Sequence, residues 1–156
     1  MIKERISLMI ATCLGTGYFP KMPGTAGSAL AAMVYIILPA AIFSSISGNL
    51  LFLLLILILF IILIPFVNVS EKILGHDNGK IVIDEFLGYM TATVFLPKSL
   101  TTALAAFVFF RLYDILKPEP VNALQKLPGG FGVMADDLMA GIYANISSQI
   151  VFRILI

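Results

Sequence analysis

Long apolar stretches separated by short polar or glycine-rich breaks dominate the pattern of this chain. From Met22 to Ser70 there is no Asp, Glu, Lys, Arg or His, and that run is long enough for two helices of about 20 residues each. Breaks rich in Gly, Pro or charge divide the chain into five apolar segments that we interpret as helices: Ser28 to Phe43, Leu50 to Val69, Ile81 to Leu96, Leu100 to Leu116 and Leu138 to Ile156. The pattern predicts an all-α integral membrane protein, a bundle of about five transmembrane helices.

The first residues predict a further helix of a different kind. Apolar side chains recur at helical spacing at Ile2, Ile6 and Met9, opposite Lys3 and Ser7. Such an amphipathic pattern is typical of a helix that lies in the membrane interface. We therefore expect an N-terminal interfacial helix beside the bundle, and residues 1–156 to form one membrane-embedded domain.

Composition agrees with the membrane interpretation and excludes other classes. Apolar residues make up 60% of the chain and charged residues 12%, well outside the range of soluble globular proteins. The formal net charge of +1 provides no basic surface for nucleic acid. The single cysteine, Cys13, excludes an internal disulfide and a cluster of metal-bound thiolates.

The charged residues collect on one side of the predicted membrane. Five spans place the connections around residues 15–27, 70–83 and 117–135 on the same side. That side carries most of the lysines and arginines, namely Lys3, Arg5, Lys21, Lys72, Lys80, Arg111, Lys117 and Lys126. Only Lys98 and Arg153 fall opposite, so the positive-inside rule predicts that the crowded side faces the cytoplasm.

Most of the acids lie on the same side. Seven of the nine are Glu71, Asp77, Asp84, Glu85, Asp114, Asp136 and Asp137. The pairs Asp84-Glu85 and Asp136-Asp137 open predicted helices, where one carboxylate would serve as an ordinary N-terminal cap. The second acid of each pair exceeds what a cap needs. Because ionisable groups at membrane depth are costly and usually functional, we interpret both pairs as candidate Mg²⁺ ligands.

Basic side chains accompany the acids. Arg111, Asp114 and Lys117 are spaced i, i+3, i+6, so they share a helix face that could hold a phosphate. The alternative is that Arg111 and Lys117 extend to lipid head groups. Lys21 and Thr25 belong to a segment rich in Gly and hydroxyl groups that could cradle a phosphate at a helix N-terminus. Its alternative role is an interfacial loop, with Ser28 as the helix cap.

Two further motifs give little information about function. Gly130-Phe131-Gly132-Val133-Met134-Ala135 fits the letters G-x-G-x-x-A, but no strand precedes it, which excludes a dinucleotide fold. His76 is the only histidine and lies in a polar loop. We expect it to be solvated or hydrogen-bonded, and it is a minor candidate.

Four segments together resemble one family of bacterial membrane enzymes. They are Pro20-Lys21-Met22-Pro23-Gly24-Thr25-Ala26-Gly27-Ser28, Ile83-Asp84-Glu85-Phe86-Leu87-Gly88, the run from Phe110 to Pro120, and the run from Gly129 to Gly141. In that order the chain resembles the phosphatidylglycerophosphatase A family. The resemblance implies hydrolysis of phosphatidylglycerophosphate to phosphatidylglycerol and inorganic phosphate, with Mg²⁺ required, in the bacterial inner membrane.

The residues and the resemblance together suggest a mechanism. Asp84, Glu85, Asp136 and Asp137 would bind one or two Mg²⁺ ions that activate a water molecule, with Asp84, Asp114 and Asp137 as the catalytic acids. Lys21, Thr25, Arg111 and Lys117 would bind the substrate phosphate. Asp114 is either a further ligand or the group that orients the water, and a covalent route through Thr25 stays open.

Two other classes compete with an enzyme. A small cation carrier or channel would use intramembrane carboxylates to bind the transported ion. It predicts acids near the middle of the membrane, whereas here they gather at one interface beside basic residues. A purely structural membrane subunit would leave the surplus acids unexplained. The lipid phosphatase is therefore the favoured hypothesis, acting on a phospholipid substrate in the bilayer.

Overall fold

The structure is a computed structural model that describes residues 1–155, with side chains described through Arg153. Within those residues it contains helices and no strand. The elements are α1 (Ile2–Ala11), the 3₁₀ turn η1 (Thr16–Tyr18), α2 (Pro23–Ile37), α3 (Ala41–Ser44), α4 (Ile46–Leu74), α5 (Ile83–Ala92), α6 (Leu100–Leu116), α7 (Val121–Gln125), α8 (Gly129–Ile150) and the π-helical turn η2 (Val151–Leu155). The predicted all-α class is confirmed.

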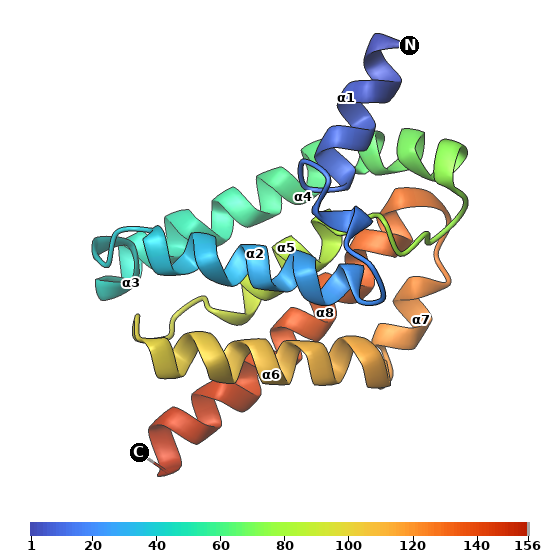
Figure 1. Cartoon of the computed structure of the whole chain (residues 1–156). Helices are drawn as coiled ribbons and strands as arrows, with labels where there is room; N and C mark the ends of the chain where they lie inside the picture. Colours follow the sequence, from blue (N-terminus) through green and yellow to red (C-terminus); the bar gives the residue numbers. More distant parts are fainter. Residues whose placement is uncertain (156) are drawn as a thin grey trace.

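Helix α8 is the centre of the arrangement. It packs most extensively against α5 and α6 and also contacts α4 and α7. Figure 1 shows α2, α4, α5, α6 and α8 running in alternating directions. The N-terminal ends of α2, α5 and α8 and the C-terminal ends of α4 and α6 therefore meet at one end of the molecule, where α1 also projects from the body. The connections carrying most of the charge lie at that end.

Helix α2 begins inside the glycine-rich segment, a start that the sequence left open, and α8 begins earlier than the sequence predicts. Helix α2 starts at Pro23, because proline suits the first helical position, so Ser28 lies inside the helix and is not its cap. Helix α8 starts at Gly129, where we expected a loop until Leu138. Its first-turn Gly130 packs against α4, where an added Cβ would lie 2.8 Å from Val67 Cβ. This glycine permits close packing and does not break the helix.

The boundaries of the other helices differ less from those predicted. Leu100–Leu116 is the predicted segment, and α4 extends the predicted Leu50 to Val69 at both ends. Helix α5 ends at Ala92, and residues 93–99 form a longer connection than the expected turn at Pro97-Lys98. The segment expected from Ser28 to Phe43 divides into α2 and the short α3.

Large apolar side chains lie on the outside of the long helices. They include Leu51, Leu54, Leu55, Ile58, Ile61 and Ile62 of α4, Met33 and Ile37 of α2, Leu104, Val108 and Leu112 of α6, and Ile142 and Ile146 of α8. Soluble proteins rarely expose a continuous apolar surface of this kind. Within residues 1–155, α4 alone is both long and apolar enough to cross a membrane, at roughly 44 Å for 29 residues. A bundle of five spanning helices stays a prediction.

Polar side chains secure the irregular backbone at the end far from α1. The Asn49 carboxamide oxygen accepts from Phe95 N at 2.7 Å. Asn145 Nδ2 donates to Ala92 O at 3.0 Å and to Val94 O at 2.6 Å. Lys98 Nζ donates to Ile36 O at 2.9 Å at the end of α2. These contacts satisfy backbone groups that an apolar environment would leave without partners.

Glycines set the spacing between α5 and α8. A Cβ added at Gly141 would lie 2.2 Å from Gly88 O, and one added at Gly88 would lie 2.6 Å from Asp137 O. The two backbones therefore approach as closely as small residues allow in membrane helix pairs. This contact fixes α8 against the helix that carries Asp84 and Glu85.

The close contact predicts that Gly141→Ala destabilises the protein. In an uncrowded helix this change would stabilise by about 1 kcal/mol, but here the new methyl group would meet Gly88 O. We expect a loss of about 1–3 kcal/mol, measured as a lower thermal unfolding temperature in detergent. Gly79→Ala is the control, because its nearest neighbour would be Pro23 Cγ at 3.8 Å. An unchanged or higher Tm for Gly141→Ala would contradict this packing.

Candidate active site

Three carboxylates from two helices form the centre of the site. Asp84 and Glu85 lie in the first turn of α5, and Asp137 comes from the third turn of α8. One oxygen of each lies within 4.8 Å of the others, and Asp84 and Asp137 are 7% and 3% exposed. Glu85 Oε2 is buried without a hydrogen-bond partner. Oxygen donors gathered this closely suit a hard divalent cation, because buried like charges need a counter-charge.

Arg111 of α6 lies beside this group. Its Nη1 is 2.5 Å from Asp114 Oδ2 and 3.9 Å from Glu85 Oε1. The same nitrogen donates to Ser28 Oγ at 3.5 Å, while Nε is buried without a partner. Arg111 therefore joins α2, α5 and α6, and the predicted shared face of Arg111 and Asp114 is confirmed by their ion pair.

The start of α2 approaches the carboxylates because of a glycine. A Cβ added at Gly24 would lie 2.1 Å from Glu85 Oε1 and 3.2 Å from Arg111 Nη1. Any larger residue would separate α2 from the site. The N-terminal turn of a helix favours anions through its free amides and its dipole, so this placement stabilises the negative charge of Glu85.

Lys117 and Asp136 form a separate pair. Lys117 caps the C-terminus of α6 in a left-handed conformation, with φ 43° and ψ 56°. Its Nζ donates to Asp136 Oδ2 at 2.6 Å. We expected Asp136-Asp137 to open a helix, but both lie well inside α8 because the preceding glycines are helical. The structure leaves Asp136 outside the three-carboxylate group that contains Asp137.

The remaining predicted residues lie around this centre. Lys21 is exposed, in a left-handed conformation with φ 71°. Thr25 is half-buried in the first turn of α2. His76 Nδ1 lies 2.5 Å from the buried Glu71 Oε1, as expected for a hydrogen-bonded histidine. The structure therefore brings together Asp84, Glu85, Asp137, Asp114 and Arg111, and it does not bring Lys21 into that group.

Two residues that contribute to the site, Ser28 and Gly24, were not predicted from the sequence. Ser28 was interpreted as a helix cap, yet its hydroxyl donates to Gly24 O and accepts from Arg111. The available signal was the recurrence of small residues at Gly24, Gly27, Ser28 and Ala31, which is typical of a helix face in close contact with neighbours.

Cys13 is close to the site but does not take part in its chemistry. It is 8% exposed, and its Sγ lies 3.8 Å from Val82 O. Burial, and to a smaller extent the charge of Glu85, raises the pKa of the Cys13 thiol to about 12. A thiol held protonated at neutral pH is a poor nucleophile, so Cys13 is poorly suited to a nucleophilic role.

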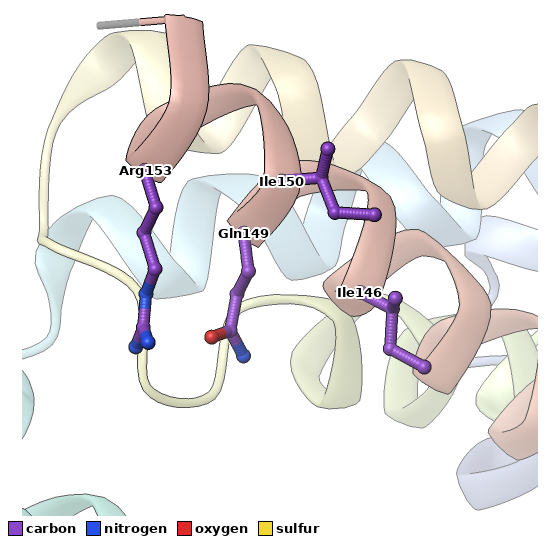
Figure 2. A pocket seen from close by; sticks show the side chains of 4 residues that line it. All are labelled: Ile146, Gln149, Ile150 and Arg153. Atoms are coloured by element: carbon purple, nitrogen blue, oxygen red, sulfur yellow. The ribbon is translucent and has the colours of Figure 1, made fainter.

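A cavity elsewhere on α8 lacks acidic residues. It has a volume of about 300 Å³ and is lined by Ile146, Gln149, Ile150 and Arg153. Figure 2 shows Gln149 and Arg153 pointing the same way from the C-terminal end of the helix. The candidate active site is at the opposite part of α8.

Comparison with known proteins identifies the family of this chain. Residues 9–152 match the model of the family described as phosphatidylglycerophosphatase A. The chain is 37% identical to "Phosphatidylglycerophosphatase A" of Haemophilus influenzae, covering 92% of this chain and 90% of the relative, and 33% identical to the Escherichia coli protein of that name, covering 86% and 76%. It is also 34% identical to "Putative phosphatidylinositol-3-phosphatase" of Bacteroides thetaiotaomicron, covering 90% of each. No solved structure matches. The chain belongs to the phosphatidylglycerophosphatase A family.

Proposed function

We propose that this chain is a lipid phosphatase that hydrolyses phosphatidylglycerophosphate to phosphatidylglycerol and inorganic phosphate. The observation that carries the proposal is the group of Asp84, Glu85 and Asp137, whose oxygens lie within 4.8 Å of one another next to Arg111. A structural protein has no need of three carboxylates this close together, two buried and one partly buried, because their repulsion is costly. Membership of the family supports the same activity.

The donor set fits a magnesium ion. Asp84, Glu85 and Asp137 offer only oxygen, the ligand that Mg²⁺ prefers, and Glu85 Oε2 is a buried acceptor without a donor. We therefore propose these three residues as the ligands. When bound, Mg²⁺ supplies polarisation of a phosphoryl oxygen and a more acidic water. Asp114 lies outside this group, and its ion pair holds the Arg111 guanidinium in place.

The basic residues provide the electrostatic part of the mechanism. Arg111 retains donor capacity, because a guanidinium carries five N–H groups and its ion pair with Asp114 and its contact with Ser28 both use Nη1. Held in place by Asp114, the guanidinium can stabilise the charge that develops on the phosphoryl oxygens without reorganising. Lys117 adds a second cation at the end of the same helix. The second role predicted for Asp114, orienting the attacking water, stays a prediction.

The hydrolysis balances without another reactant. The oxygen of water forms a bond to phosphorus, and the ester bond from phosphorus to the glycerol oxygen breaks. One proton of the water ends on that glycerol oxygen, giving phosphatidylglycerol, and the phosphoryl group leaves as inorganic phosphate. No covalent enzyme intermediate is required, so Thr25 needs no nucleophilic role.

We also propose that the enzyme is embedded in the bacterial inner membrane with its site facing the cytoplasm. The exposed apolar side chains of α2, α4, α6 and α8 support lipid contact around the body. The acids and most of the basic residues lie at the end where α1 projects (Figure 1), and the positive-inside rule assigns that end to the cytoplasm. A lipid would keep its acyl chains in the bilayer while its head group reaches the carboxylates.

A cation carrier is the competing hypothesis. Transport across the membrane requires polar groups that continue from one side to the other. Within residues 1–155, the acids named above lie at one end, and the polar side chains Asn49 and Asn145 at the other end are occupied by backbone contacts. This arrangement favours chemistry at one interface.

Phosphate release from phosphatidylglycerophosphate in detergent micelles tests the proposal. We expect release that requires Mg²⁺ and falls roughly 100-fold or more in Asp84→Asn and in Asp137→Asn, because each change removes a charged ligand whose loss costs several kcal/mol. Glu4→Gln is the control, since Glu4 is exposed on α1 and pairs only with the N-terminal amine. It should retain full activity.

The names of the relatives refer to two different lipid substrates, so the identity of the substrate is tested in a separate assay. Phosphatidylinositol 3-phosphate is assayed beside phosphatidylglycerophosphate under identical conditions. Faster release from the inositol lipid would replace the proposed substrate and keep the lipid phosphatase. If the folded wild type releases no phosphate from either lipid, the enzyme proposal fails, and cation uptake into vesicles becomes the next assay.

The proposed orientation predicts which sites an impermeant maleimide can reach. Ser44 is exposed at the end of α3, and Lys126 is exposed between α7 and α8 at the active-site end. In spheroplasts we expect Ser44→Cys to be labelled directly and Lys126→Cys only after lysis. Native Cys13 should stay unlabelled, because it is buried and its pKa is raised. Labelling of Lys126→Cys alone before lysis would reverse the orientation.

A further inference from the structure

Asp136, the partner of Lys117, has no role in the mechanism described above. Asp136 is 2% exposed, and its Oδ2 accepts from Lys117 Nζ at 2.6 Å. Its Oδ1 is buried and has no partner among the described residues. Lys117 is therefore the sole side chain, within the described part of the chain, that neutralises this carboxylate. A buried charge with a single partner depends strongly on that partner.

Helix geometry separates Asp136 from its neighbour Asp137. Adjacent residues in an α-helix leave the axis about 100° apart. Asp137 faces α5, where its oxygen joins those of Asp84 and Glu85. Asp136 faces the C-terminal end of α6. The two adjacent acids therefore contact different helices, α5 for Asp137 and α6 for Asp136.

Lys117 is placed by both its backbone and Asp136. Its left-handed φ of 43° is a conformation that residues with a β-carbon seldom adopt. The ammonium group has three protons. Asp136 accepts a hydrogen bond from one of them, and the side chain is 26% exposed, which leaves two N–H groups that Asp136 does not use.

A lysine without this partner would weaken the site in two ways. Its long side chain would sample many rotamers and lose conformational entropy on binding a phosphate. It would also be drawn to the carboxylates nearby, because the charges of Asp137 and Asp114 act on the same ammonium. An internal lysine bound there would compete with a divalent cation for the three-carboxylate group.

We propose that Asp136 is a positioning residue and not a metal ligand: it holds the Lys117 ammonium for the substrate phosphate and away from Asp84, Glu85 and Asp137. The proposal rests on the proposed function, since the phosphate belongs to the lipid head group. It reassigns one of the four acids that the sequence pattern had grouped as ligands. Asp136 then acts on the substrate through Lys117.

The test is a double-mutant cycle with Lys117→Met, Asp136→Asn and the double variant, with Asp137→Asn for comparison. Three quantities are measured: KM for phosphatidylglycerophosphate in micelles, the Mg²⁺ concentration for half-maximal activity, and binding of inorganic phosphate by titration calorimetry. We expect each single variant to raise KM about tenfold, and the double variant to raise it no further. The Mg²⁺ requirement should change less than twofold, whereas Asp137→Asn should raise it tenfold or more.

Phosphate binding keeps the test independent of the lipid activity. Lys117→Met and Asp136→Asn should weaken phosphate binding by the same factor, even if the natural substrate is a different lipid. Lys126→Met is the control, because Lys126 is exposed on the neighbouring connection, and it should change none of the three quantities. Thermal unfolding of each variant identifies any that fail to fold, and Lys117→Arg then replaces Lys117→Met, with partial retention of phosphate binding expected.

Three results would overturn the proposal. A Mg²⁺ requirement raised tenfold by Asp136→Asn would make Asp136 a metal ligand. Multiplicative effects in the double variant would show that the two residues act separately. A lower Tm with unchanged KM and unchanged phosphate binding would reduce the pair to a structural link between α6 and α8.

Discussion

The electrostatic cost of burying Asp84, Glu85 and Asp137 within 4.8 Å of one another is the constraint on which the rest of the structure depends. Carboxylates in a poorly solvated site repel each other and lose hydration, so they need positive charge at fixed positions. The protein supplies it from three directions. Arg111 comes from α6, the amino end of α2 approaches Glu85 through Gly24, and Lys117 balances the adjacent Asp136. The remaining negative charge is what a divalent cation would neutralise.

Small residues make that concentration of charge sterically feasible. Gly88 and Gly141 bring the α5 and α8 backbones together, and Gly24 brings α2 against Glu85. Larger side chains at these points would clash with the facing backbone or with Glu85 and push these helices apart. At the other end of the molecule, Asn49 and Asn145 satisfy the backbone that follows α5. The helix carrying Asp84 and Glu85 is thus held at both of its ends.

Much of the fold and part of the site could be predicted from the sequence. Leu100–Leu116 was predicted to the residue, because Ser99 caps its start and Pro118 follows its end. The clustering of acids at one end was predicted from the number of spans, because five spans place the charged connections on the same side. The start of α8 could not be predicted, since a glycine in a loop and a glycine packed against Val67 look alike in a sequence. The contact between Asp136 and Lys117 could not be predicted either, because it depends on the left-handed backbone conformation of Lys117.

Helix α8, at the centre of the structure, is the last long helix to be synthesised. This order has a consequence for how the protein is assembled in the cell. Asp84 and Glu85 are made more than fifty residues before Asp137, and Arg111 and Lys117 are also made before it. Until α8 inserts, the two acids of α5 have only Arg111 and the start of α2 to balance them, and the surface of α5 that receives Gly141 is uncovered. The group formed by Asp84, Glu85 and Asp137 is completed by the last long helix. Under the proposed function, a nascent or truncated chain therefore cannot act on membrane lipids before its translation is nearly finished.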